Sequence, residues 1–278
     1  RGTPNRTFHA PFGLQGLEGP KGEYLTDRLT DEAEEFFEAN REKPFFLYLA
    51  HFAVHDPIEG PADLAAKYQD KLAQQDPSQG PAFVLEGNPD SPTPPTNRDQ
   101  IKQTADAGFR VLPNRQVKIK QHQDNAQFAA MVEAVDQSLG RVVAKLKQLD
   151  LADNTILIFF SDNGGMSGAN FGNPKRVVSK QKLDRAFSTS NLPLRGAKGW
   201  LYEGGIRVPL IIRWPGHTKK SLTCDEPVIS TDLYPSILEM AGLPSKPAQH
   251  LDGISLAPLL QGESTLDREA IYWHFPHY

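Results

Sequence analysis

The chain has 278 residues, of which 38% are hydrophobic and 23% are charged, and its formal net charge is −4. This length and composition are ordinary for a folded protein with a substantial core, and they argue against an intrinsically disordered chain. Lysine and arginine are scattered along a slightly acidic sequence, which argues against nucleic acid as a partner, and no apolar run is long enough to span a membrane.

The two ends and the cysteine count set further bounds. The sequence begins RGTPNRTFHAPFG, with neither an initiator methionine nor the charged-then-apolar order of a signal peptide. We therefore expect a processed chain or an internal piece of a longer one. Cys224 is the only cysteine, which excludes a disulfide within the chain.

The first strong pattern predicts a helix followed by a strand. Apolar residues between 29 and 37 share one helical face, Pro44 closes the connection, and residues 45–50 (FFLYLA) predict a short strand buried on both sides. His51 and His55 follow at once in HFAVHDP. A histidine in such a place more often only hydrogen-bonds to a backbone carbonyl, so each one alone favours a structural role.

A long irregular stretch comes next. Residues 76–121 are rich in proline, glycine, asparagine and aspartate without sustained periodicity, which predicts a surface insertion within one domain. Apolar residues then recur every three or four positions from 128 to 149 and predict an amphipathic helix.

The helix leads into TILIFFSDNGGMSG, where a predicted strand over residues 155–160 runs into Asp162 and Asn163. A carboxylate and an amide oxygen are hard ligands suited to Ca²⁺ or Mg²⁺, although aspartate, asparagine and glycine are also the residues that turns prefer. Ligands bind at the carboxyl ends of strands in open α/β sheets. Two predicted apolar strands, 45–50 and 155–160, are each followed directly by side chains that could bind a ligand.

A second irregular segment covers residues 164–193, and LRGAKGWLYEGGIRVPLIIRWPG follows it. Lys198 lies among glycines that could let its ammonium approach an anion, although a solvated surface lysine is the plainer alternative. A strand over 208–212, a capped helix in STDLYPSILEMAGLP, a helical turn in DGISLAPLLQG and a strand starting in EAIYWHF complete the chain. The alternation predicts an α/β fold with a mainly parallel sheet.

Six blocks, in order, resemble the central and later part of type I sulfatases of the alkaline phosphatase superfamily. They are PFFLYLAHFAVHDP, AAMVEAVDQSLGRVV, ILIFFSDNGG, LRGAKGWLYEGGIRVPLIIRWPG, STDLYPSILEMAGLP and LDGISLAPLLQG, and the resemblance runs from about residue 24 to the end. It implies an alkaline-phosphatase-like sandwich, a mainly parallel central sheet flanked by helices, which is incomplete at both ends.

The resemblance also implies roles for four residues. Asp162 and Asn163 match calcium ligands, Lys198 matches the lysine that binds a sulfate oxygen and the leaving group, and His55 matches the histidine at the sulfate and ester oxygen. His51 has no catalytic counterpart, so we expect it to be structural. A cation, an ammonium and an imidazole suit sulfate ester cleavage, in which negative charge moves onto the bridging oxygen.

The sequence departs from the family pattern at both ends. The early pair of aspartates that completes the calcium site and the Cys- or Ser-x-Pro-Ser-Arg segment that yields formylglycine do not occur, and Cys224 lacks the motif around it. We expect residues 1–270 to be a partial catalytic domain and 271–278 the start of a C-terminal subdomain. Such a chain would hold half of a metal site and no nucleophile, and would be inactive alone.

The intact protein is thus expected to be a Ca²⁺- and formylglycine-dependent sulfatase acting on sulfated carbohydrate. The resemblance to the family also implies export to the periplasm or beyond. Two alternatives stay open. One is a phosphodiesterase or phosphonate monoester hydrolase of the same superfamily, and the other is a non-catalytic module that binds sulfated glycans.

Overall fold

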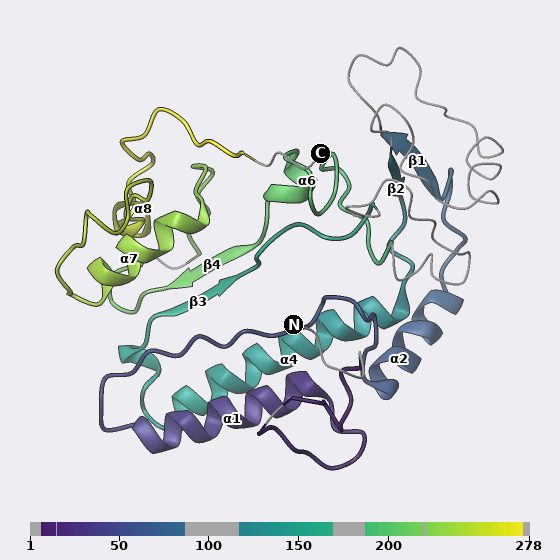
Figure 1. The fold of residues 1–278 in the computed structure, drawn as a ribbon, viewed down its shortest axis with the longest axis horizontal. Helices are drawn as coiled ribbons and strands as arrows, with labels where there is room; N and C mark the ends of the chain where they lie inside the picture. Colours follow the sequence, from purple (N-terminus) through teal and green to yellow (C-terminus); the bar gives the residue numbers. More distant parts are fainter. Residues whose placement is uncertain (1–6, 15, 87–116, 169–186, 219–220, 275–278) are drawn as a thin grey trace. The chain divides into compact units, whose positions relative to one another are not determined.

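The computed structural model describes residues 7–14, 16–86, 117–168, 187–218 and 221–274 (Figure 1). The chain divides into two compact units. Unit 1 comprises Arg1–Leu149, Asp162–Val208 and His277–Tyr278, and unit 2 comprises Asp150–Ser161 and Pro209–Pro276. Most of each predicted insertion, and the last residues of the predicted C-terminal subdomain, lie outside the described residues.

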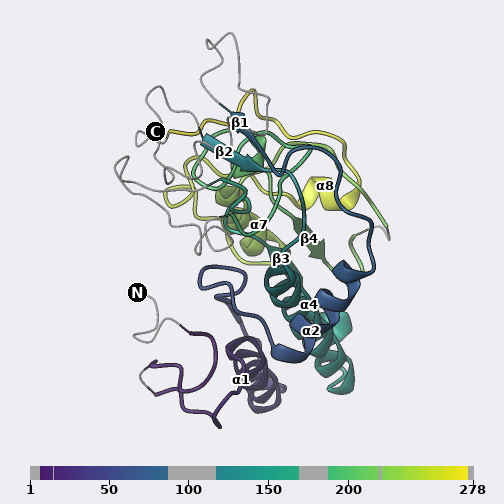
Figure 2. The same cartoon turned by 90° about the vertical axis from the view of Figure 1, so that its right-hand side faces the viewer.

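Unit 1 is built around three helices, α1 (Leu25–Asn40), α2 (Ala62–Ala73) and α4 (Ala126–Gln148). Both α1 and α2 lie beside α4 (Figures 1 and 2). Asn125 caps α4, because its side-chain oxygen accepts a hydrogen bond from the Phe128 amide at 3.2 Å. The predicted helices over 29–37 and 128–149 are confirmed.

The buried stripe of α4 contains small residues, namely Ala130, Ala134 and Ser138, next to Met131. Side chains of this size let α1 and α2 approach the helix closely. Met131 and Ala130 join a core cluster that also includes Leu25 of α1.

Two short ladders are formed by the described residues. In unit 1, β1 (Phe83–Glu86) pairs with β2 (Val117–Lys120), and in unit 2, β3 (Leu157–Phe160) pairs with β4 (Leu210–Arg213). Both ladders are antiparallel, so the expectation of a mainly parallel sheet is wrong for this part of the chain. Strand positions follow from local apolar runs, whereas the direction of pairing depends on the neighbours that the strands meet.

Residues 45–50 form no ladder with any described segment, and their predicted burial on both sides is wrong. Phe46 is 71% exposed and Tyr48 is 82% exposed, while the alternate side chains are half-buried. The Phe45 ring lies 5.5 Å from that of Phe37. The segment therefore packs on one side only, because no described element covers the other. The predicted strand in EAIYWHF likewise forms no ladder in its described residues, 269–274.

Unit 2 also contains α7 (Leu233–Met240) and α8 (Ala257–Gln261), as the sequence predicts, and the 3₁₀ turns η1 (Ala152–Asn154) and η3 (Ser230–Asp232). Asp232 is fully buried and accepts hydrogen bonds from the amides of Ile229 and Ile254 at 2.9 and 3.0 Å. It also pairs with Arg268 at 2.8 Å. These contacts tie the start of α7 to the chain after it. None of the described helices is both long and apolar enough to span a membrane.

Candidate functional site

The four predicted site residues all belong to unit 1. Asp162 and Asn163 are two and three positions after the end of β3, and Asp162 is exposed while Asn163 is half-buried. The Asn163 amide nitrogen donates to Asp162 Oδ1 at 3.1 Å and to the Gly164 carbonyl at 3.4 Å. The two side chains therefore lie together at the end of the strand.

Hydrogen bonds join residues 162–168, which we call the Asp162 segment, to residues 191–206, which we call the Lys198 loop. The Gly164 amide donates to the Gly205 carbonyl at 2.9 Å, and the Asn191 side chain donates to the Gly165 carbonyl at 2.8 Å. A Cβ on Gly164 would come within 1.9 Å of the Gly204 carbonyl oxygen. The close approach of the two backbones therefore requires glycine at this position.

Lys198 is held by its backbone against the Asp162 segment. Its amide donates to the Gly165 carbonyl at 3.1 Å, and the buried Ser167 hydroxyl donates to the Gly196 carbonyl at 3.1 Å. Lys198 itself is half-buried. The structure thus brings Lys198 and the two predicted metal ligands into one hydrogen-bonded region, although they are more than 30 positions apart in the sequence.

An aromatic stack follows Lys198 in the same loop. The Arg195 guanidinium lies 3.9 Å from the Tyr202 ring centroid, and the Trp200 and Tyr202 rings are stacked at 6.2 Å. Tyr202 precedes the short helix α6 (Glu203–Ile206). Cation–π and ring contacts of this kind restrict the conformations of a loop, and here they restrict the loop that carries Lys198.

His55 lies in a separate loop and is exposed. Its amide donates to the Phe52 carbonyl at 2.9 Å, and its Nδ1 lies 3.0 Å from the Asp56 carbonyl oxygen. Because a carbonyl oxygen only accepts, Nδ1 carries the proton, which leaves Nε2 as the nitrogen that can bind or transfer one. Both contacts stay within the His55 loop, so they do not join it to the Lys198 loop.

His51 is a largely buried residue with a structural role in the described fold. Its Nε2 lies 3.0 Å from the Ser138 hydroxyl of α4, which lies 2.6 Å from the Thr30 hydroxyl of α1. Thr30 donates in turn to the Thr26 carbonyl at 2.7 Å. Burial lowers the pKa of His51 and favours the neutral imidazole. The sequence signal for this network was two polar residues on helix faces that are otherwise apolar.

The chemistry of the donors at Asp162 and Asn163 fits calcium, which takes oxygen ligands. The Asn163 nitrogen faces the Asp162 carboxylate, so the amide would turn over to present its oxygen beside it. Calcium takes six or more oxygens. No group of three or more His, Cys, Asp or Glu side chains suited to a metal occurs among the residues that the structure describes. Asp162 and Asn163 would therefore supply only two of the oxygen ligands that a calcium ion needs.

The sequence matches the sulfatase family over residues 2–243. It is 32% identical to a sulfatase of Formosa agariphila, over 99% of this chain and 40% of that protein, and 28% identical to human steryl-sulfatase, over 90% of this chain and 32% of that protein. The fold is similar to the crystal structure of Ps i-CgsB in complex with k-i-k-neocarrahexaose, with a TM-score of 0.58 and 29% identity over 90% of this chain and 41% of the other.

The chain thus spans less than half the length of each of these relatives. The expected α/β class and the alkaline-phosphatase-like fold of sulfatases are confirmed. The family match covers the Asp162 segment, the Lys198 loop and the His55 loop alike. This chain is a member of the sulfatase family.

Proposed function

We propose that the protein to which this chain belongs hydrolyses sulfate monoesters of carbohydrates. The observation that carries the proposal is the hydrogen-bonded region in which the Gly165 carbonyl fixes Lys198 beside the Asp162 segment. Family membership supports the reaction, and the similarity to a protein solved with an oligosaccharide supports the substrate class. By the same resemblance we propose export to the periplasm or beyond.

The chain's own residues would act on the charge of the ester. The Lys198 ammonium would neutralise a sulfate oxygen and the bridging oxygen as the S–O bond breaks, which stabilises the transition state more than the substrate. His55 would donate a proton from Nε2 to the departing alkoxide, because its Nδ1 is already engaged by the Asp56 carbonyl.

Asp162 and Asn163 would hold part of the calcium site. When bound there, the cation supplies Lewis-acid stabilisation of the sulfate group. We expect the nucleophile, a formylglycine by family resemblance, outside this chain, since no Cys- or Ser-x-Pro-Ser-Arg stretch occurs in its 278 residues. The chain alone is therefore expected to be inactive.

The test uses the complete protein with paired aryl sulfate and aryl phosphate esters of 4-nitrophenol. A sulfatase hydrolyses the sulfate with the higher kcat/KM, and Lys198→Ala lowers that value by about 10²- to 10³-fold, as loss of one transition-state donor does. Lys147→Ala, at an exposed lysine in the last turn of α4, is the matched control and should change little.

Two results would redirect the proposal. A higher kcat/KM on the aryl phosphate than on the aryl sulfate would favour the rival phosphodiesterase or phosphonate monoester hydrolase of the same superfamily. Binding of sulfated glycan without turnover of any ester would instead support a non-catalytic module.

A further inference from the structure

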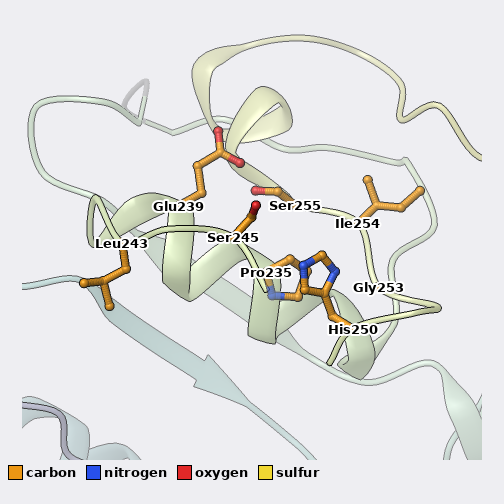
Figure 3. Close-up of a pocket in the computed structure, with 8 residues that line it drawn as sticks. All are labelled: Pro235, Glu239, Leu243, Ser245, His250, Gly253, Ile254 and Ser255. Carbon is orange, nitrogen blue, oxygen red and sulfur yellow. The ribbon is translucent and has the colours of Figure 1, made fainter. Parts of the chain in front are cut away.

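The pocket that lies beside α7 in unit 2 has a volume of about 460 Å³ (Figure 3). It is lined by residues between Pro235 and Ser255, and so by none of the residues proposed to act on the sulfate ester. Those residues belong to unit 1, where the side chain of Asn191 connects the backbone segments that carry three of them. The described contacts that support the proposed site therefore come from within unit 1.

The Asn191 side chain joins three points of the backbone. Its Nδ2 donates to the Gly165 carbonyl and to the Gly204 carbonyl, each at 2.8 Å, and the Gly196 carbonyl oxygen lies 3.4 Å away. Because a side-chain amide nitrogen carries two hydrogens, the two short bonds use both of its donors. Gly165 belongs to the Asp162 segment and Gly204 to the far end of the Lys198 loop. One side chain thus closes the loop and holds it against the segment.

The Gly165 carbonyl is the point at which Asn191 meets Lys198. This oxygen accepts the bond from Asn191 and also the bond from the Lys198 amide, at 3.1 Å. A Cβ on Gly165 would come within 2.7 Å of Asn191 Oδ1, so the asparagine packs directly against this residue. Groups that share one hydrogen-bond network are energetically coupled. Loss of the Asn191 amide should therefore be felt at Lys198.

The backbone before Asn191 is itself held in place, by Gln123. The Gln123 Nε2 donates to the Ser190 carbonyl at 2.6 Å, and the Thr189 hydroxyl donates to Gln123 Oε1 at 2.7 Å. Thr189 and Ser190 are both buried, and Gln123 lies three residues before the 23-residue helix α4. Asn191 therefore extends from a fixed backbone, as a supporting residue of a preorganised site should.

We infer that Asn191 is a positioning residue for ester hydrolysis, which acts through Lys198 by fixing the Gly165 carbonyl. The inference rests on the proposed function. It assigns to Asn191 the task of keeping the Lys198 ammonium at a set place relative to Asp162 and Asn163. Such placement matters because a shift of about 1 Å in a reacting group can lower a rate by about 10²-fold.

The first test is hydrogen exchange of the complete protein, followed by mass spectrometry of peptides that contain Lys198. Asn191→Ala removes both donors, and Asn191→Asp points a carboxylate oxygen at two carbonyl oxygens. In both variants we expect the Lys198 amide to exchange about tenfold faster or more, because the loop opens more readily.

Asn40→Ala is the matched control for these variants. Asn40 is half-buried like Asn191, and its Nδ2 also donates to a backbone carbonyl, that of Phe36 at 2.8 Å, but it lies at the end of α1. The substitution removes a comparable hydrogen bond, so it should leave both the exchange of Lys198 and the activity unchanged.

The second test is the kinetics of the complete protein on 4-nitrophenyl sulfate. We expect both Asn191 variants to lower kcat/KM by about 10²-fold, mostly through kcat, because Lys198 is proposed to act on charge that develops in the transition state. Added to Lys198→Ala, Asn191→Ala should lower kcat/KM by about threefold at most, since no ammonium is left to position. A residue that only stabilises the fold would not show this dependence on Lys198.

Three outcomes would overturn the inference. They are unchanged exchange at Lys198 in both Asn191 variants, equal kinetic losses in Asn40→Ala, and losses that multiply in full with those of Lys198→Ala. Aspartate is almost the same size as asparagine, so Asn191→Asp decides the matter if Asn191→Ala does not fold.

The outcomes also separate this inference from the proposed function. Activity that Lys198→Ala lowers and neither Asn191 variant changes would overturn the role of Asn191 alone. A complete protein that hydrolyses no sulfate ester would overturn the proposed function, and the exchange experiment would then decide whether Asn191 holds the Lys198 loop.

Discussion

Two histidines four positions apart occupy opposite environments in this protein. The His51 ring is largely buried and bonded to a serine of α4, whereas the exposed His55 keeps Nε2 available. Burial stabilises the neutral form of an imidazole, and exposure lets it exchange protons with water and substrate. The same residue type therefore suits a structural role at one position and proton transfer at the other.

The environment of His51 predicts a pH dependence of stability. Because its pKa is lowered on folding, the unfolded chain binds this proton more tightly than the folded chain does. The free energy of unfolding should fall as the pH drops below about 6.5, the ordinary pKa of histidine. His51→Gln does not titrate and should flatten the decline between about pH 7 and pH 5.5, on either side of that pKa, as measured by denaturant unfolding.

His217→Gln, at an exposed histidine, is the control for that experiment and should keep the parental slope. Asp27, whose pKa is raised by desolvation, acts in the opposite direction at lower pH. The comparison therefore rests on the difference between each variant and the parent. An unchanged slope in His51→Gln would contradict the assignment.

The exposed Nε2 of His55 predicts an effect that depends on the leaving group. An alkoxide needs a proton as it departs, whereas 4-nitrophenolate is stable without one, so His55→Ala in the complete protein should lower kcat/KM by about 10²-fold or more for alkyl sulfates and much less for 4-nitrophenyl sulfate. His217→Ala should affect neither. Equal losses on both substrates would argue for a binding role alone.

At the scale of elements, glycines decide the path of the Lys198 loop and its contact with the Asp162 segment. Gly164, Gly204 and Gly205 each lie so close to a carbonyl oxygen that no Cβ fits. Backbone atoms cannot move aside as a flexible side chain does. The position of Lys198 therefore depends on glycines, which have no side chain that could take part in the reaction.

Gly205→Ala tests this dependence. Its Cβ would lie 2.1 Å from the Trp200 carbonyl oxygen and 2.5 Å from that of Ala197. We expect a loss of about 1–3 kcal/mol in unfolding free energy, as for other overpacked sites, together with reduced activity of the complete protein. Denaturant unfolding and kcat/KM on an aryl sulfate measure the two effects.

Gly140→Ala is the matched control for that change. This glycine lies within α4, and no atom outside the backbone of its own helix lies within 4 Å of the place that a Cβ would take. Alanine is the better helix former by up to about 1 kcal/mol, so the substitution should stabilise the chain and leave activity unchanged. Similar losses in both variants would show that the contacts around Gly205 are not special.

Considered as a whole molecule, the chain would hold only part of the calcium site that we propose. Asp162 and Asn163 would supply two donors, and the chain spans 40% of its relative from Formosa agariphila. The complete protein should therefore bind calcium much more tightly than these 278 residues alone. Asp162→Ala should weaken calcium binding by the complete protein at least tenfold, as measured by calorimetry.

Asp225→Ala, at an exposed aspartate in unit 2, is the control for the calcium measurement.

Removal of calcium with a chelator should lower the thermal midpoint of the complete protein, because a ligand that binds only the folded state stabilises it. Equal calcium affinity of the 278-residue chain and the complete protein would count against a site that needs further ligands from outside this chain.

Much of the local structure could be predicted from the sequence. The helices α1, α4 and α7 and the strands β3 and β4 lie where periodicity and turn residues place them. The pattern did not reveal α2, whose buried residues are only Leu64 and Ala65. The predicted strand at 45–50 failed for a physical reason, since an apolar run becomes a strand only where a partner pairs with it.

The sequence by itself determined the family, the order of the chemical blocks and the identity of the four candidate site residues, because motifs and short-range periods are carried by neighbouring residues. The tertiary structure decided the antiparallel pairing of β3 with β4, the burial of His51 beside Ser138 and the bond from Lys198 to Gly165. Each of these depends on the close approach of segments that are distant in the sequence, and burial, pKa and hydrogen bonding follow from that approach.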